Sequence, residues 1–494
     1  MSSRERPAAD LRRRLRLAGG VAAAALLGLS ARAYQLQIAR GAELTGKLDD
    51  ARAERVRLGP PRGTLRDARG EVVAEDGVAY DAYVLPYALG FQREERMPRL
   101  AAALDLDEEE QGRLRARLDA LPQSARRTPL LVKRDVGAAA AETLRRSLRG
   151  EAQVRERAAR RHPHGALAIQ AIGYLNEVLP EEVDRDYRPG DRTGRAGVER
   201  AFEGVLRGSV GFTFRPASRW ATLPEGREAV QPLPGRDVTL SLDLELTRAV
   251  DDAFEEQQQH LGAGVLLDAR TGRVLAMTSR PSFDPDLLDR GLPLPTEGRP
   301  ELDRVTNDPL GPVATFQPFA GPGAPAAASG AALGAALGPG DVALTPLQLA
   351  VAYAALANGG TIFEPGLVLR AGDDPVEPVV RRKLDVPQAD LARVRAALRA
   401  NVAGAGHGGV FADLRGRVAG TMGVALSPRP QALPAVAGPP REDGWFAGFA
   451  PADAPEVVVV VSTRDTTTGA ERAAAAIAAG ALRAYFADRD GGSR

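Results

Sequence analysis

The 494-residue sequence contains no cysteine. Disulfides, thiolate zinc sites and cysteine nucleophiles are therefore excluded. Lysine is almost as scarce, since Lys47, Lys133 and Lys383 stand against 62 arginines, and the four histidines are scattered along the chain. We therefore expect no metal centre and no bound cofactor. The formal net charge of +1 provides no global field for nucleic acid, so a nucleic-acid partner is not expected either.

One uncharged, Ala- and Leu-rich run near the N-terminus could be a membrane segment. Six arginines occur in the first sixteen residues, and the fifteen residues Leu17–Ala31 are then uncharged. As a helix they rise about 22 Å, short of the roughly 30 Å hydrocarbon core, a gap that Arg16 and Arg32 could close by snorkelling. We predict a membrane anchor at 17–39 with a cytoplasmic N-terminus. A signal peptide cleaved at Ala31–Ala33 and a cytoplasmic amphipathic helix are the alternatives.

Proline and glycine punctuate the rest of the chain. Gly59-Pro60-Pro61 ends a polar segment, residues 40–57, which we predict to be helical, and two short extended pieces follow around an Asp-Ala-Arg-Gly turn. Residues 91–160 are rich in Arg and Glu and are predicted to be helical with solvated faces. The linker Gln231–Asp237 marks a domain boundary. The predicted domains are a cytoplasmic tail (1–16), a membrane anchor (17–39), a pedestal (40–235), a larger C-terminal domain (236–488) and a tail (489–494).

Beyond the linker the hydrophobic pattern is sharper. An alternating strand at 237–243 leads into a helix, Leu244–Gln259, and a hairpin then turns at Ala269–Gly272. Thr345–Asn358 is predicted to be a helix, with a threonine cap, proline at its first position and two glycines after its end. Three strands follow, and an Ala-rich helix, Gly469–Phe486, closes the domain. Strands from both ends of the domain beside helices predict an α+β fold with an antiparallel sheet flanked by helices.

Several motifs occur in an order that is specific to one protein family. They are PPRGTLRDARGEVVA (Pro60–Ala74), RRHP with AIGYL (Arg160–Pro163, Ala171–Leu175), GRAGVERAFEGVLRGSVG (Gly194–Gly211), TGRVLAMTSRPSFDP (Thr271–Pro285), TPLQLAVAYAALANGG (Thr345–Gly360) and WFAGFAP (Trp445–Pro451). Together they resemble the class B penicillin-binding proteins, which are monofunctional peptidoglycan D,D-transpeptidases. The resemblance implies a short cytoplasmic tail, one membrane helix, a pedestal of the penicillin-binding protein dimerisation type and a penicillin-binding or β-lactamase-like transpeptidase domain.

The resemblance also implies three catalytic motifs. In the family, a serine in S-x-x-K attacks the D-Ala-D-Ala carbonyl, and the lysine one helical turn later accepts its proton. An S-x-N motif shuttles protons. A K-T-G strand binds the substrate carboxylate and contributes to the oxyanion hole.

In this chain the motifs are degenerate. The nucleophile motif aligns with PVATFQP, so that Ala314 takes the serine position and Gln317 the lysine position. A methyl group cannot attack a carbonyl, and a neutral amide cannot act as the base. K-T-G aligns with Thr421, Met422 and Gly423, so the cation that would pair with a carboxylate is missing while the glycine is kept.

The register of this alignment has independent support. The residues three positions before the three lysines are Leu44, Leu130 and Val380, so no S-x-x-K occurs in the chain. The serine between the two degenerate motifs, Ser329, is followed by Gly-Ala, so S-x-N is absent as well. Only nineteen residues separate Pro318 from the glycine that begins the next matching block, and they include a Gly-Pro-Gly helix breaker. The helical subdomain is therefore predicted to be shortened.

We expect a non-catalytic pseudo-transpeptidase that acts as a scaffold or regulator in cell-wall synthesis, with a role in cell shape or division. One alternative is an active serine transpeptidase with a relocated nucleophile at Ser279, Ser282 or Ser427. Another is a module that binds peptidoglycan without turnover. The resemblance implies polytopic lipid II glycosyltransferases and other wall or division proteins as partners. It also implies a single-pass location in the cell (inner) membrane, with the bulk of the chain outside the cytoplasm, in a periplasm or in a Gram-positive wall zone.

Overall fold

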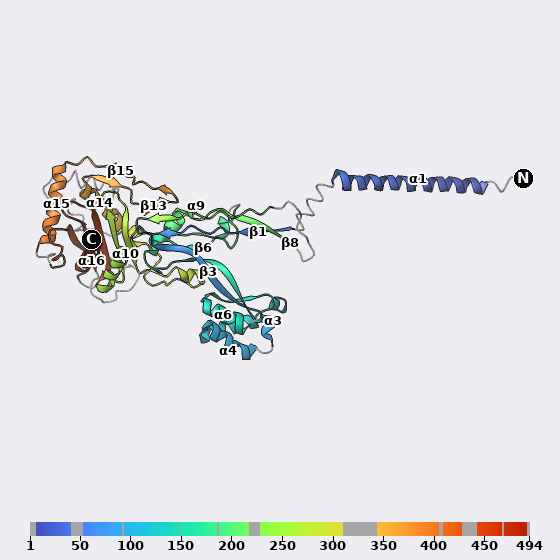
Figure 1. Ribbon diagram of the computed structural model, residues 1–494, viewed down its shortest axis with the longest axis horizontal. Helices are drawn as coiled ribbons and strands as arrows, with labels where there is room; N and C mark the ends of the chain where they lie inside the picture. The colour runs from blue at the N-terminus through green and yellow to red at the C-terminus, as the bar shows by residue number, and fades with distance from the viewer. Residues whose placement is uncertain are drawn as a thin grey trace. The chain divides into compact units, whose positions relative to one another are not determined.

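The chain folds as two compact units, one formed by residues 1–61 with 208–234 and the other by residues 62–207 with 235–494. The computed structural model describes residues 6–40, 53–90, 93–148, 150–184, 187–216, 228–309, 343–404, 409–426, 442–466 and 469–491 (Figure 1). Within these units the architecture is α+β, as predicted. The domain boundary proposed near residue 235 remains a prediction.

The first unit begins with a long helix. Helix α1 (Arg6–Tyr34) continues into a π-helical turn, η1 (Gln35–Ala39), and residues Leu17–Ile38 are long and apolar enough to cross a membrane, with a mean hydropathy of 1.3. These 22 residues rise about 33 Å as a helix, which exceeds the hydrocarbon core. The helix runs on past Arg32, so the candidate span is longer than the uncharged run alone suggested.

The rest of the first unit is a small antiparallel ladder. Strand β1 (Ala53–Leu58) pairs with β8 (Gly211–Pro216), and bridges to residues 230 and 233 add a third segment. The helix predicted for 40–57 is therefore wrong over β1. The physical reason is that Val56 and Leu58 alternate with polar residues, and their pairing partner lies more than 150 residues away along the chain.

The second unit contains a sheet in the order β14-β13-β9-β2-β3-β4, with β5 also paired to β3. Its strands are β2 (Leu65–Arg66), β3 (Val72–Val84), β4 (Leu130–Val136), β5 (Ala152–Arg161), β9 (Val238–Leu240), β13 (Val368–Ala371) and β14 (Asp374–Pro375). The two extended pieces expected around the Asp-Ala-Arg-Gly turn are β2 and the start of β3. The prediction that 91–160 is helical is wrong at β4 and β5, because long-range pairing with β3 overrides local propensity there.

A small helical cluster covers the far end of β3. Its helices are α3 (Pro86–Leu89), α4 (Arg93–Leu104), α5 (Glu108–Asp119) and α6 (Ala138–Ser147), and Figure 1 shows three of them gathered beside the strand. Met97, Leu100 and Leu144 are fully buried between them. Short elements then carry the chain back along the sheet. They are α7 (Ile169–Ile172), β6 (Leu175–Glu177), β7 (Arg192–Gly194), α8 (Gly197–Ala201) and α9 (Glu203–Leu206).

The core of the C-terminal part is a five-stranded antiparallel sheet in the order β11-β10-β18-β17-β16. The strands are β10 (Gly262–Asp268), β11 (Val274–Arg280), β16 (Ala419–Leu426), β17 (Glu442–Ala450) and β18 (Val457–Thr466). Val458 and Val460 pack with helix α14 (Pro346–Asn358) on one face. On the other face Val457, Val459 and Val461 pack with α10 (Leu244–Glu256) and α16 (Ala470–Gly491) (Figure 1). A continuous valine run thus fits a strand that is buried on both faces.

Local signals predicted the starts of these helices and both ends of α14, whereas α10 ends at Glu256 rather than Gln259 and α16 continues past Phe486 to Gly491. Thr345 and Gln348 form a reciprocal capping box at the start of α14, and Gly359 ends the helix with a left-handed φ of 91°. Asp243 caps α10 by accepting a hydrogen bond from the amide of Leu246. The hairpin β10–β11 and the three strands before α16 were also predicted correctly. The remaining elements are α11 (Asp286–Asp289), α12 (Arg304–Asn307), β12 (Thr361–Phe363), β15 (Val380–Lys383) and α15 (Gln388–Ala403).

Candidate active site

Strand β16 carries the positions that correspond to K-T-G. It lies at an edge of the five-stranded sheet, and among the described residues it pairs only with β17. Thr421 lies opposite Ala447, and Gly423 lies opposite Trp445. The strand that aligns with the family's substrate-binding strand is therefore formed, as an edge strand among the described residues.

The two substituted positions of this motif face opposite sides of the sheet. Thr421 is 8% exposed and shares the face of Ala447 and Trp445, which pack in the same cluster as α14. Met422 packs on the other face, with the cluster that contains α16. The Thr421 hydroxyl donates a long bond of 3.4 Å to the carbonyl of Met422, so the side chain in the lysine position is short, neutral and turned to its own backbone. Thr421 offers no cation that could pair with a carboxylate.

The other half of the predicted site is not described. Ala314 and Gln317 lie within residues 310–342, outside the described residues, and so does Ser329. Ser427 also lies outside them. The described chain stops at residue 309 and resumes at residue 343. The assignment of these positions therefore stays a prediction from the sequence.

Two arginines, Arg304 (buried) and Arg464 (half-buried), contact Asp308, and both have acidic partners. Arg464, near the end of β18, forms a short ion pair with Asp308 and lies 3.9 Å from Asp443. Arg304 of α12 contacts Asp308 at 3.8 Å, and its side chain donates to the carbonyls of Gly298, Arg299 and Leu302. Burial, the largest influence, lowers the pKa of Arg304. These groups hold α12 against the sheet, and their charges are already compensated.

The two described serines proposed as relocated nucleophiles, Ser279 and Ser282, make structural hydrogen bonds. The hydroxyl of Ser279 donates to the carbonyl of Leu302 at 3.0 Å and accepts from the amide of Arg304 at 3.0 Å. The hydroxyl of Ser282 donates to the carbonyl of Ala166 at 2.6 Å. A nucleophilic serine needs a base that accepts its proton, whereas both of these protons point at backbone carbonyls. The geometry gives neither serine an activating group.

The motifs before the transpeptidase-like part meet in a buried ionic network. Arg62 comes from PPRG, Arg160 from RRHP, and Glu199 and Glu203 from GVERAFEG. The Arg160 Nε donates to one Glu199 oxygen at 2.8 Å, and Arg62 lies 2.6 Å from the other oxygen and 2.6 Å from Glu203. The side chains of Arg160 and Glu199 are 1% and 0% exposed. The sequence shows a charged residue in each of these motifs, but it does not show which of the charged residues form ion pairs with one another.

A second ionic cluster joins the pedestal elements to α11. Asp289, whose side chain is 3% exposed, accepts from Arg157 of β5 at 3.0 Å and forms a short pair with Arg192 of β7. Burial alone would raise the pKa of Asp289, but the bonds and charges of the two arginines outweigh it and lower the pKa below the usual 3.8. Three segments distant in sequence are therefore held through one carboxylate.

This pKa direction predicts an acid-dependent loss of stability. A carboxylate with a lowered folded-state pKa contributes stability above its unfolded value, and the contribution is lost as the pH falls through the folded pKa. We expect Asp289→Asn to lower the thermal midpoint at pH 7, and the gap to the unsubstituted protein to shrink once the pH falls below about 3.8. Scanning calorimetry from pH 7 to pH 3 tests this. A gap that is constant over the whole range would contradict the ionic role of Asp289.

No group of three or more His, Asp or Glu side chains that could hold a metal occurs among the described residues. His162 and His164 both have carboxylate neighbours instead. The Nδ1 of His162 lies 3.4 Å from Asp286, and the Nε2 of His164 lies 3.2 Å from Glu71. Both histidines thus serve local contacts between segments of the second unit.

Two family models match the chain. The penicillin-binding protein dimerisation domain matches residues 57–240, and the penicillin-binding protein transpeptidase domain matches residues 317–483. The second match begins at the position of Gln317 and ends within α16.

Relatives with assigned names agree with these matches. The peptidoglycan D,D-transpeptidase MrdA of Escherichia coli K12 is 26% identical over 312 residues, which cover 59% of this chain and 48% of the relative. MrdA of Acinetobacter baumannii is 28% identical over 57% of this chain and 42% of the relative. Penicillin-binding protein 3 of Bacillus subtilis is 27% identical over 48% of this chain and 35% of the relative. The chain spans less than half the length of these relatives.

A solved structure shares the fold. It belongs to a study described as "Structural coordination of polymerization and crosslinking by a peptidoglycan synthase complex". The similarity covers 96% of this chain and 98% of the other, with a TM-score of 0.65 and 24% sequence identity. At this identity the likeness establishes the fold.

Proposed function

This chain belongs to the class B penicillin-binding protein family, and from that premise we propose that it is a non-catalytic member which acts as a scaffold or regulator of peptidoglycan synthesis. The observation that carries the proposal concerns strand β16, which aligns with K-T-G and pairs in register with β17. It has Thr421 and Met422 in place of the lysine and the threonine. Strand β16 pairs as a K-T-G strand would, but its side chains cannot perform the chemistry of that motif.

The missing groups are those that the reaction requires. Acyl transfer needs an oxygen nucleophile, a base for its proton and donors for the oxyanion. Ala314 supplies no nucleophile, and Gln317 supplies no base. Thr421 replaces the cation that would bind the carboxylate of the donor peptide. Loss of the nucleophile alone precludes an acyl-enzyme at this site, and loss of the base and the cation also removes proton transfer and the anchor for the substrate carboxylate.

The parts outside the cleft are preserved, which favours a scaffold over a decaying enzyme. The network of Arg62, Arg160, Glu199 and Glu203 is complete, and every buried carboxylate in it has an arginine partner. Unpaired buried charges are costly, so a chain no longer required to fold would be expected to lose such a network early. Its persistence supports a role for the pedestal itself.

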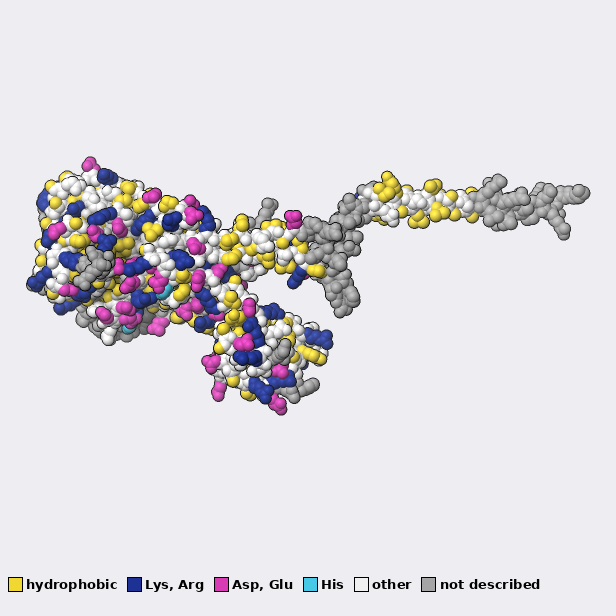
Figure 2. All heavy atoms as spheres, in the orientation of Figure 1, with side chains coloured by type: hydrophobic (Ala, Val, Ile, Leu, Met, Phe, Trp, Pro, Cys, Tyr) yellow, Lys and Arg dark blue, Asp and Glu magenta, His cyan; other side chains and the backbone are white. Residues whose placement is uncertain are grey.

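The proposed partner is a polytopic lipid II glycosyltransferase in the same membrane. The ladder in the first unit exposes Val230 by 47% and Leu233 by 65%, and Phe212, which bridges to Val230, lies edge to face with Phe214 at 5.8 Å. Figure 2 shows hydrophobic side chains gathered over β1 and β8. A ladder of two or three short strands is marginally stable alone in water, so burial against a protein partner would stabilise it.

Labelling with a fluorescent penicillin tests the loss of chemistry. We expect no covalent adduct on the intact mass of the detergent-solubilised protein after prolonged incubation, because no serine is activated at the family position. MrdA of Escherichia coli, treated in parallel, supplies the positive control. A stoichiometric adduct would overturn the proposal, and mapping its peptide would identify the serine.

A further inference from the structure

A pocket of about 410 Å³ opens on the α10–α16 face of the five-stranded sheet, the face opposite α14. It lies between the first turns of α10, the last turns of α16, strand β11 and the Asp67–Gly70 turn. Thr421, which takes the lysine position of the K-T-G motif, lies on the opposite, α14 side of the sheet. The pocket is therefore distinct from the degenerate active site. Its size falls in the range of roughly 300–1,000 Å³ that is typical of small-molecule sites.

The pocket has an apolar floor. Leu246 and Ala249 of α10, Leu275 of β11, and Ala484 and Tyr485 of α16 line it. Leu246 and Tyr485 are buried in the cluster between the helices and the sheet, while the two alanines are half-buried. Because both alanines are small, the helices leave a hollow between them. An apolar group of the size of a phenyl ring could remove this surface from water.

The rim of the pocket is charged, and its cations are already paired. Arg69 donates to Asp243 at 2.7–2.8 Å, lies 2.8 Å from Asp488, and lies 3.3 Å from Glu245. These bonds raise the pKa of Arg69, with the hydrogen bond to Asp243 as the largest cause. Arg489 pairs closely with Glu456 and stacks over the ring of Tyr485 at 4.6 Å.

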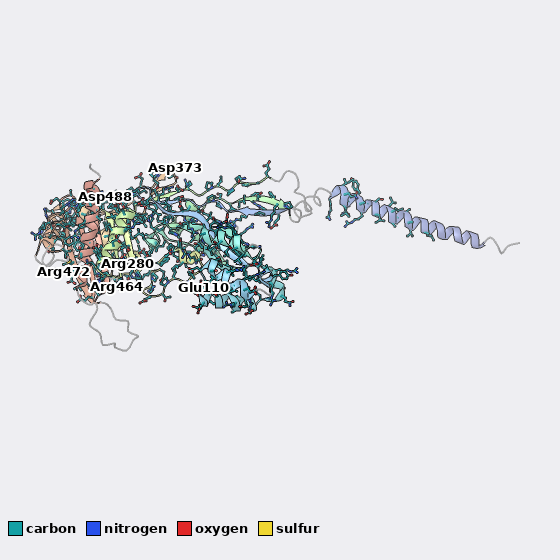
Figure 3. The ribbon with its side chains drawn as sticks, turned by 60° about the horizontal axis from the view of Figure 1, so that its bottom comes forward. Glu110, Arg280, Asp373, Arg464, Arg472 and Asp488 are labelled. Carbon is teal, nitrogen blue, oxygen red and sulfur yellow. The ribbon has the colours of Figure 1, made fainter. Side chains whose placement is uncertain are left out.

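The carboxylates on the rim can still accept hydrogen bonds from a further cation. Asp488, labelled at the end of α16 in Figure 3, and Glu245 are 49% and 75% exposed, and each contacts Arg69 through one oxygen. The charged lining residues comprise two arginines and three carboxylates, a net charge of −1. We propose that this pocket binds a small organic cation with an apolar body, such as an arylalkyl ammonium, with its ring on the alanine floor and its charge at Glu245 and Asp488.

Phenethylammonium is the probe, and 2-phenylethanol and phenylacetate are its neutral and anionic counterparts. Binding to the detergent-solubilised full chain is measured by saturation-transfer NMR titration. We expect the ammonium to bind with millimolar or tighter affinity, the alcohol more weakly, and the anion not at all. Glu245→Gln with Asp488→Asn should weaken the ammonium roughly two- to fivefold for each exposed carboxylate and leave the alcohol unchanged.

Variants that fill the hollow distinguish binding of the probe in the pocket from partition of the probe into detergent. Ala249→Leu and Ala484→Leu each place a larger side chain at a half-buried helical position that lines the pocket, and each should abolish saturable binding. Ala473→Leu, also half-buried on α16 but outside the pocket, is the matched control and should bind like the unsubstituted protein. Equal binding by the filled variants, or preference for the anion, would overturn the proposal. The result is independent of whether penicillin labels the chain.

Discussion

Replacing Glu199 with glutamine should destabilise the second unit by about 3–5 kcal/mol, because it leaves Arg160 and Arg62 buried without their shared counter-charge. Glu199 has no exposed side-chain surface, so water cannot take its place. A neutral amide can accept from one arginine but cannot balance two. We expect a lowered thermal midpoint in scanning calorimetry and earlier proteolysis of the pedestal, since its strands and the preceding motif are joined through this residue.

The control removes a comparable ion pair on the surface. Glu142 and Arg146 lie one helical turn apart on α6 at 3.4 Å and are both more than half exposed. Glu142→Gln should therefore change stability by no more than about 0.5 kcal/mol. Arg160→Met, alone and combined with Glu199→Gln, completes a double-mutant cycle in which the two costs should be far from additive. If the two losses of stability are additive, or if the Glu199 variant is as stable as the Glu142 variant, the network does not stabilise the fold.

Predictions from sequence succeeded where the deciding information is local. The capping residues of α14 lie within four positions of each other, and the β10–β11 hairpin is set by its own turn. Strands β4 and β5 failed for the opposite reason. They lie in an Arg- and Glu-rich stretch whose local pattern favoured a helix, and their pairing with β3 spans tens of residues, so the local pattern could not show it.

The candidate site likewise has some features that can be predicted from a local motif and others that depend on contacts between distant segments. The substitutions at Thr421 and Met422 could be read directly from a motif, and the structure adds that they face opposite sides of β16. The network around Glu199 could not be predicted, because its four residues come from three separate motifs. The pocket beside Arg69 was equally invisible, since its lining joins one turn, two helices and a strand that are far apart in sequence.

Charged substitutions on the ladder of the first unit should abolish the proposed scaffold function without unfolding the second unit. Val230→Glu and Leu233→Glu place carboxylates at two exposed apolar positions of the ladder, and each should weaken partner binding by about 2 kcal/mol or more if its position lies in the core of an interface. We expect the double variant to fail to complement a deletion of the gene. Val380→Glu, which replaces a valine that is 55% exposed on β15 of the second unit, should complement fully.

A photo-crosslinking residue at position 233 identifies what the ladder contacts in the native membrane. The proposal requires a polytopic glycosyltransferase among the crosslinked products, and Val230→Glu should reduce that product about tenfold or more. If the double variant complements as well as Val380→Glu, the ladder is not the functional surface. If it fails to complement but no glycosyltransferase is captured, the scaffold acts on a different wall protein, and the proposed partner is wrong. Complementation thus tests the surface, while the crosslink tests the partner.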